Sequence, residues 1–229
     1  MRKRVRWSWV MGLLAIAACG DDAGGEPTTE DQGPATPGCR SGQFPGGTGT
    51  LTLCGPGPTD RACMPIEKFQ GYTKYGGDIS VFPGSLPDLT ALSCLSEVGR
   101  LSVGQSTELT NLHGLENVSK ASALELLGNK KLTSLEGLKK LTSVIQITIN
   151  SNDSLTDIVG LPQGFSTGSL YVGINYGLTS LDGLKGIKVT RTLAFEGNKK
   201  LSICTVKAFG AAYPGVELVN DRNLDEKCP

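Results

Sequence analysis

Apolar residues recur every 23 residues through the centre of this 229-residue chain. Each unit opens with two apolar residues separated by one position, as at Leu124 and Leu126, and carries a leucine eight residues after its start. Less regular units begin at Ile79 and Val216. The regular units begin at Leu101, Leu124, Ile147, Leu170 and Leu193, and the leucines eight residues later are Leu109, Leu132, Leu155, Leu178 and Leu201.

The spacing within a unit predicts one short strand followed by a returning segment. An apolar–polar–apolar alternation buries one face of a strand, but a single strand has no partner within its own unit. Stacking of successive units provides that partner, because the strands then pair side by side as a parallel sheet with a spacing of about 4.8 Å. The leucines of the returning segments close the core between neighbouring units. We therefore predict a β-rich solenoid over residues 79–228.

Asparagine recurs five residues after the start of four units. A side-chain amide offers donors and an acceptor, and backbone groups lose their ladder partners where the chain turns off a strand. Asparagines stacked one per coil can satisfy those groups, so we predict a structural ladder of Asn129, Asn152, Asn175 and Asn198. Glycine recurs thirteen residues after the start, which predicts a tight backbone position at Gly114, Gly137, Gly160 and Gly183.

The unit that starts at Leu124 resembles the leucine-rich repeat, L-x-L-x-x-N-x-x-L, at Leu124, Leu126, Asn129 and Leu132. The looser units and the cysteines near the ends are similar to the receptor L-domain, and the resemblance covers roughly residues 63–228. Leucine is expected three residues before each start, where the chain has Ala121, Val144, Thr167 and Thr190. This departure favours the L-domain version. The resemblance implies a right-handed parallel β-helix-like fold with few short helices and disulfide-closed ends.

The first 19 residues are typical of a bacterial lipoprotein signal. Four basic residues precede an apolar run over residues 7–18, which is shorter than the roughly 20 residues of a membrane-spanning helix. The small residues before Cys19 resemble the bacterial lipobox, which implies acylation of this cysteine, for example by palmitate, and anchoring to the cell envelope, with the outer membrane favoured over the inner.

Four segments follow from these patterns. Residues 1–18 are predicted to be a signal peptide, and residues 19–38 are predicted to be the lipidated cysteine with a disordered tether, because this stretch has no large apolar side chain to bury. We expect an irregular, cysteine-containing cap over residues 39–78. The solenoid and its C-terminal cap follow over residues 79–228.

Six cysteines remain once Cys19 is assigned to lipid, and export to an oxidising compartment predicts three disulfides. Cys204 lies at a core position of the last regular unit and Cys228 lies next to the C-terminus, so we predict that these two are bridged. The other four cysteines allow three pairings, of which we prefer Cys63–Cys94 with Cys39–Cys54.

Charge and motifs argue against two classes of function. The chain has 22 basic and 22 acidic residues, and removal of the signal takes away four basic ones, which leaves 18 against 22, or net −4. No basic tract suggests nucleic acid, and we expect neither a metal nor a cofactor. A G-x-S-x-G motif occurs at residues 164–168, but the hydrolase version needs a later histidine, whereas the only histidine, His113, precedes Ser166. We therefore expect no enzymatic activity.

The outward side chains of the strands form the expected binding surface. Resemblance to repeat solenoids implies that this face binds proteins or glycans, so we predict a membrane-anchored, monomeric recognition or adhesion module. The alternative is a structural envelope protein without a soluble ligand. At a constant period the outward row is Ser102, Glu125, Thr148, Tyr171, Ala194 and Glu217. Interface hot spots favour Trp, Tyr and Arg, so the candidate binding residues are Tyr171 and Leu127, with Glu125 and Thr148 beside them.

Overall fold

The computed structural model describes residues 38–45, 47–55, 63–225 and 228. The predicted signal peptide, the predicted lipidation site Cys19 and the predicted tether up to residue 37 lie outside these residues. No helix in the described ranges is long and apolar enough to cross a membrane. In chain order the elements are β1 (Arg40–Gln43), β2 (Thr50–Cys54), β3 (Met64–Pro65), the 3-10 helix η1 (Ile66–Phe69), β4 (Tyr72–Tyr75), β5 (Asp78–Phe82), η2 (Thr90–Leu92), β6 (Glu97–Gly104), β7 (Lys120–Leu127), β8 (Ser143–Asn150), β9 (Ser166–Gly173), η3 (Asp182–Leu184), β10 (Lys188–Glu196), α1 (Ile203–Gly210) and β11 (Glu217–Asp221).

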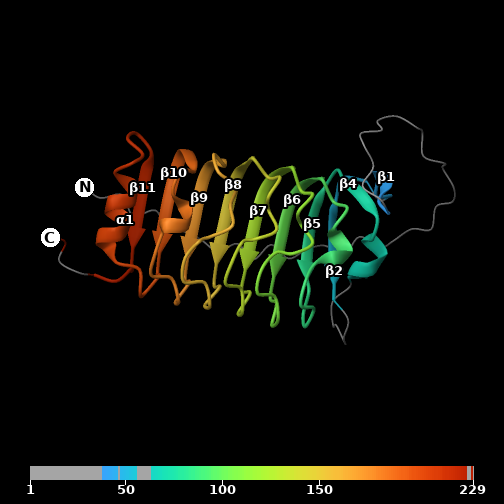
Figure 1. The fold of residues 1–229 in the computed structure, drawn as a ribbon, viewed down its shortest axis with the longest axis horizontal. Coiled ribbons are helices and arrows are strands. Elements are labelled where there is room, and N and C mark those ends of the chain that lie inside the picture. Colours follow the sequence, from blue (N-terminus) through green and yellow to red (C-terminus); the bar gives the residue numbers. More distant parts are fainter. Residues whose placement is uncertain (1–37, 46, 56–62, 226–227, 229) are drawn as a thin grey trace. The chain divides into compact units, whose positions relative to one another are not determined.

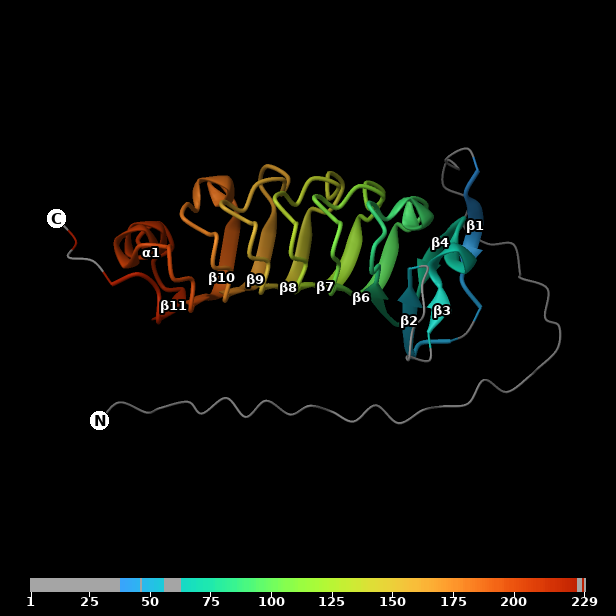
Figure 2. The ribbon, with the colours of Figure 1, turned by 90° about the horizontal axis from the view of Figure 1, so that it is seen from below.

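The strands form one parallel sheet in which consecutive coils lie side by side (Figure 1). The strand order is β11-β10-β9-β8-β7-β6-β5-β2-β3. Parallel neighbours require a crossover between them, and the returning segments and α1 lie on the same side of the sheet (Figure 2). The fold is a parallel β-solenoid of about six turns with a period of about 23 residues, as the apolar pattern predicts.

The strand register aligns the apolar positions of successive coils. Leu124 lies opposite Leu101 on one side and Ile147 on the other, and this column continues to Leu170 and Leu193. Burial of a leucine side chain contributes roughly 1.5–3 kcal/mol relative to exposure, so the column is a main source of stability. The leucines eight residues after each start are all fully buried: Leu109, Leu132, Leu155, Leu178 and Leu201.

The sheet continues into the residues that were predicted to form an irregular cap. β2 pairs in parallel with β5, so that Leu51 lies opposite Ile79. β4 and β5 together replace one long strand, because β6 pairs with β4 through Glu97 and with β5 through Leu101. The interruption falls at Gly77, where a Cβ would lie 2.0 Å from the carbonyl oxygen of Gly49. β2 has the same alternation at Leu51 and Leu53, but Leu51 precedes Ile79 by 28 residues, so the 23-residue period does not reach it.

Aromatic side chains close the N-terminal end of the core. The ring of Phe44 stacks on Phe69 at a centroid distance of 5.1 Å and meets Tyr72 edge-on at 4.8 Å. The Tyr75 hydroxyl donates to the carbonyl oxygen of Gly49 over 3.1 Å, and burial raises the pKa of this hydroxyl. This cluster takes the place of the leucine columns where the regular coils end.

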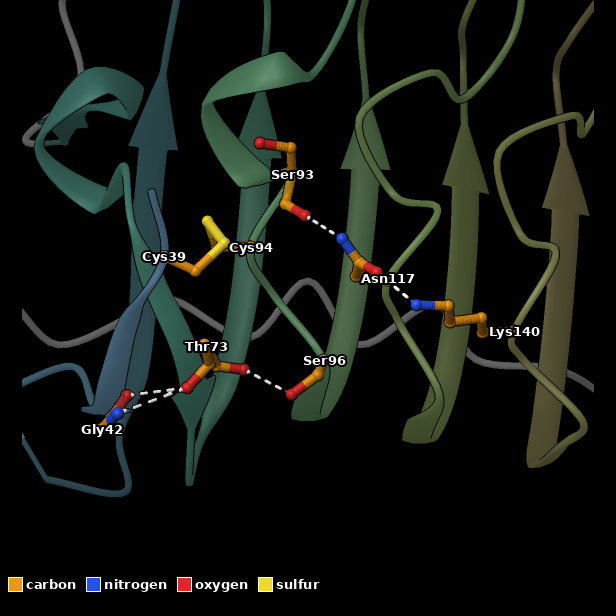
Figure 3. Close-up of a disulfide and its surroundings, with 8 residues drawn as sticks. All are labelled: Cys39, Gly42, Thr73, Ser93, Cys94, Ser96, Asn117 and Lys140. Carbon is orange, nitrogen blue, oxygen red and sulfur yellow. Dashed lines mark hydrogen bonds between the residues drawn. A yellow bond between two sulfur atoms is a disulfide. The ribbon is translucent and has the colours of Figure 1, made fainter. Parts of the chain in front are cut away.

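Two disulfides fix the N-terminal coils, in a pairing that differs from the predicted one. Cys39 bonds to Cys94 and Cys54 bonds to Cys63, so the predicted pairs Cys63–Cys94 and Cys39–Cys54 are wrong. Topology explains the difference. β4 pairs with both β1 and β6, and the cysteines that precede β1 and β6 meet (Figure 3). Cys54 ends β2, and Cys63 precedes β3, which pairs with β2.

Polar contacts join the coils around the Cys39–Cys94 bond. The Thr73 hydroxyl donates to the Gly42 carbonyl over 3.1 Å, and the Ser96 hydroxyl donates to the Thr73 carbonyl over 3.0 Å (Figure 3). Asn117 Nδ2 donates to the Ser93 carbonyl over 2.6 Å. These bonds bridge adjacent coils outside the strand ladder.

The last coil is two residues longer than the period. The register places Leu218 opposite Leu193, so the predicted start of this unit at Val216 is wrong. The returning segment contains α1, whose N-cap Ser202 accepts a hydrogen bond from the Cys204 amide over 3.1 Å. A helix advances less per residue than extended chain, which accounts for the additional residues.

Helix α1 covers the C-terminal end of the core. Its Val206 is fully buried, and its Phe209 meets Phe195 edge-on at 5.9 Å. The disulfide Cys204–Cys228, which the sequence analysis also proposed, ties the C-terminal segment to this helix. The end of the solenoid is thus closed by a helix and a covalent bond.

Candidate functional site

The outer face of the sheet carries the residues that were predicted to bind a partner. Glu125, Thr148 and Tyr171 lie opposite one another on β7, β8 and β9. Leu127 lies two residues further along β7, opposite Asn150, and is 36% exposed. The structure therefore brings the four predicted residues together on adjoining strands of one face.

Each long strand carries two consecutive outward residues just before the repeat start. In β6 the buried residues Val98 and Leu101 are three positions apart, which leaves residues 99 and 100 outside. The same spacing in β8 exposes Ile145, which is 59% accessible, and places Gln146 beside it. The sequence analysis considered only the alternating positions after the start and therefore missed this part of the face.

The face is charged over β5–β7, and its charges pair with one another. Arg100 Nε lies 3.6 Å from Glu125 Oε1 and 4.0 Å from Asp78 Oδ2. The Arg100 amide also donates to Asp78 Oδ1 over 2.9 Å. Exposed pairs of this kind contribute about 1 kcal/mol or less to stability, and they leave Arg100 with an acidic partner on each neighbouring strand. Glu125, one of the predicted binding residues, is thus already engaged by Arg100.

Over β8–β9 the face is uncharged and, apart from the exposed Ile145, polar. Gln146 Nε2 donates to Thr148 Oγ1 over 3.3 Å, and Asn150 Oδ1 accepts from the Ser151 hydroxyl over 2.6 Å. Tyr171 lies between these amides and hydroxyls and is half-buried. This combination offers hydrogen-bond donors and acceptors around one aromatic ring.

The additional residues of the last coil change the predicted outward row. Ala194 lies opposite Val219, whereas Glu217 lies opposite Thr192. Glu217 is therefore not in the row of Tyr171, as a constant period had predicted. Ala194 is only 5% exposed, so Val219 is the outward residue that ends this row.

The four predicted ladder asparagines form one buried column. Asn152 Oδ1 accepts from the Asn129 backbone amide over 3.0 Å, and Asn152 Nδ2 donates to the Leu126 carbonyl over 3.0 Å. The same bonds link Asn152 to Asn175 and Asn175 to Asn198. All four side chains have no exposed surface. Each amide thus satisfies the backbone where the chain leaves the strand.

The ladder has a fifth asparagine that the sequence analysis missed. Asn223 Oδ1 accepts from the Asn198 amide over 3.0 Å, and Asn223 Nδ2 donates to the Phe195 carbonyl over 2.7 Å. Asn223 lies five residues after Leu218, so the signal was present but hidden by the start assigned to Val216. At the other end, Ser106 takes the position of an asparagine, and its amide donates to Asn129 Oδ1.

A second polar column, also missed, caps the turns of the returning segments. An oxygen of Asn111, Ser134 or Ser180 accepts from the backbone amide two residues later, over 2.9–3.0 Å. Asp88 does the same for Thr90, and the Thr90 amide and hydroxyl lower the pKa of the Asp88 carboxyl. Short polar side chains favour such turns, and their recurrence ten residues after the starts at Leu101, Leu124 and Leu170 could have identified this column.

Each residue of the G-x-S-x-G segment has a structural role. Gly164 has φ +73°, Phe165 is fully buried, and the Thr167 hydroxyl donates to the Ser169 carbonyl over 3.0 Å. Ser166 begins β9, and its amide donates to the Thr142 carbonyl. At Gly168 a Cβ would lie 2.7 Å from the Ile145 carbonyl oxygen. Packing and backbone geometry therefore account for Gly164, Phe165, Thr167 and Gly168.

His113 lies on the returning side, away from the outer face of the sheet. Its Nδ1 is 2.6 Å from Glu116 Oε1, and the other oxygen of Glu116 accepts from the Gly114 amide. These residues line a shallow hollow of ≈ 130 Å³ together with Glu136 and Lys139. Within the described residues no group of three or more His, Cys, Asp or Glu side chains could hold a metal ion.

Comparison of the chain with protein-family models, with curated proteins and with solved structures found no match.

Proposed function

We propose that this chain is an envelope lipoprotein that recognises a partner through the outer face of its sheet. The observation that carries this proposal is the placement of Tyr171 among outward polar side chains on adjoining strands. The coil interiors are filled by apolar side chains. The outward face is therefore the large surface on which the side chains differ from one coil to the next. The L-domain and leucine-rich-repeat resemblance supports the same use of the face.

The proposal is non-enzymatic. We assign Ser166 no nucleophilic role, because the other residues of its motif are explained by packing and backbone geometry and His113 is paired with Glu116 in a turn of the returning side. Purified protein should show no esterase activity that Ser166→Ala abolishes. Loss of a measurable activity in that variant would contradict this part of the proposal.

Lipid on Cys19 would hold the module at the membrane, with the following residues as a tether. Two or three acyl chains supply enough buried methylenes for stable anchoring. Mass spectrometry of the protein from its native membrane should find an acylated N-terminal cysteine, and Cys19→Ala should release the protein into the soluble envelope fraction. An unmodified Cys19 in membrane-derived protein would contradict the anchor.

The recognition proposal is tested by partner capture from envelope extract with Tyr171→Ala. Tyr176→Ala is the matched control, because Tyr176 is 43% exposed on an adjacent turn, with Lys199 Nζ 5.0 Å from its ring centroid. We expect a saturable partner whose binding is lost in Tyr171→Ala and kept in Tyr176→Ala. Equal binding by both variants would reject this face as the binding surface. Absence of any saturable partner would favour the alternative, a structural envelope protein.

A further inference from the structure

A β-bulge on β10 turns Arg191 onto the outer face of the sheet. Lys188 and Val189 lie opposite Ser166 and Thr167, and the register then shifts so that Thr192 lies opposite Ser169. Thr190 and Arg191 together therefore oppose the single residue Gly168. Bulges of this kind re-aim a side chain and are common beside binding sites.

The guanidinium of Arg191 lies over Gly168. A Cβ built on Gly168 would be 2.4 Å from an Arg191 terminal nitrogen and 2.7 Å from its Nε. The guanidinium thus occupies the space that a side chain would take at this position. Glycine on β9 and the bulge on β10 act together, because one provides the space and the other directs the arginine into it.

Arg191 differs from the other arginine on this face in having no acidic partner. Arg100 is paired with Glu125 and Asp78, whereas within the described part of the chain the side chain of Arg191 forms no ion pair or hydrogen bond. Glu217, the acid on the neighbouring strand, instead accepts from the Thr192 hydroxyl over 3.4 Å. Lys188, three residues before Arg191, is also exposed. Among the described residues, neither of these two cations is therefore engaged in an ion pair.

A polar strip connects Arg191 to Tyr171. Gly168 and Tyr171 are three residues apart on β9, which corresponds to about 10 Å along the strand. Ser169 lies between them, opposite Gln146 on β8, but it is only 9% exposed, and Thr148 lies opposite Tyr171. A ligand along this strip would meet a cation with the exposed Ile145 beside it, then the Gln146 amide and the Thr148 hydroxyl, and then an aromatic ring.

We propose that this strip binds a carboxylate-bearing polysaccharide, with a uronate carboxylate on the Arg191 guanidinium and a pyranose ring against Tyr171. A planar guanidinium binds carboxylate through two parallel hydrogen bonds, and hydroxyl and amide side chains match sugar hydroxyls. A protein partner fits less well, because protein interfaces need a desolvated apolar centre, whereas the apolar side chains here, Ile145 and Tyr171, stand at opposite ends of the strip with polar side chains between them. The inference rests on the proposed function, because it names the ligand of the same face.

The test is calorimetric titration of the mature protein with oligogalacturonate and with the same oligomer after reduction of its carboxyl groups. We expect binding of the acidic oligomer only, and Arg191→Gln should weaken it about ten- to a hundredfold, the range for a charge-assisted hydrogen bond. The control is Lys207→Gln, which also removes one positive charge but lies on α1, on the returning side of the sheet (Figure 2). This variant should leave the affinity unchanged.

Three results would overturn the inference. They are equal affinity for the reduced oligomer, equal affinity for a sulfated glucan or for polyglutamate, and no effect of Arg191→Gln. The absence of any oligogalacturonate binding would also reject it. None of these results touches the proposed function, which stands or falls on the capture experiment with Tyr171→Ala.

Discussion

Replacement of Asn152 by alanine should remove a large part of the stability of this protein. The side chain is fully buried. Its Oδ1 accepts from the Asn129 backbone amide over 3.0 Å, and its Nδ2 donates to the carbonyls of Leu126 and Asn150 over 3.0 and 3.1 Å. Alanine leaves that amide without its acceptor and the Leu126 carbonyl without this donor, whereas the Asn150 carbonyl still accepts from the Gly128 amide over 2.9 Å. An unsatisfied buried group costs about 1–3 kcal/mol, so we expect a loss of roughly 2–6 kcal/mol.

The matched variant is Asn223→Ala at the end of the ladder. Asn223 makes the same type of bond to Asn198, but it is half-buried, so water can replace the lost amide. We expect a loss of about 1 kcal/mol there. Urea unfolding followed by far-ultraviolet circular dichroism measures both, since both tryptophans of the chain lie in the predicted signal. Losses for Asn152→Ala and Asn223→Ala that agree within 1 kcal/mol would refute burial as the reason for the ladder.

Two further predictions concern the returning segments. Gly137→Ala should lower the free energy of unfolding by roughly 3–5 kcal/mol, because Gly137 has φ +119° and a Cβ would lie 2.0 Å from the Leu112 carbonyl oxygen. The control Gly164→Ala, at φ +73° in open space, should lower it by about 1 kcal/mol. Equal losses of the two variants in thermal unfolding would contradict the steric argument. Thr90→Val should lower the unfolding free energy at pH 7 and have less effect near pH 2. The Thr90 hydroxyl and amide lower the pKa of the Asp88 carboxyl in the folded protein. The stabilisation they give is therefore complete above the ordinary carboxyl pKa of about 4 and is lost as the pH falls through the lowered pKa of the folded state. A difference between Thr90→Val and the unchanged protein that does not vary with pH in urea unfolding would contradict this prediction.

The sequence was sufficient for the regular coils because one physical requirement repeats there. Every coil must bury the same strand positions and satisfy the same backbone groups, so Leu132 and Asn129 recur at constant offsets. The turn-capping oxygens of Asn111 and Ser134 obey the same rule. They could have been recognised by applying the period to polar positions as well as to leucines.

The N-terminal disulfides could not be assigned in this way. Their pairing depends on β1 and β2 forming a coil of their own, and this coil is held by aromatic packing around Phe44 and by the close approach of Gly77 to Gly49. The Phe44 cluster does not recur in the regular coils, and Gly49 and Gly77 are 28 residues apart rather than one period. Three pairings of four cysteines therefore remained open until the strand partners of β1 and β3 were known.

The candidate site depends on departures from the repeat as much as on the repeat itself. A constant period places Glu217 in the row of Tyr171 and gives Arg191 no special status. The two additional residues of the last coil move Glu217 next to Thr192, and the bulge on β10 directs Arg191 onto the space above Gly168. Irregularities that cost ladder bonds persist where they orient a side chain. The residues that break the period are therefore the ones in which we expect ligand specificity to reside, while those that obey it hold the scaffold together.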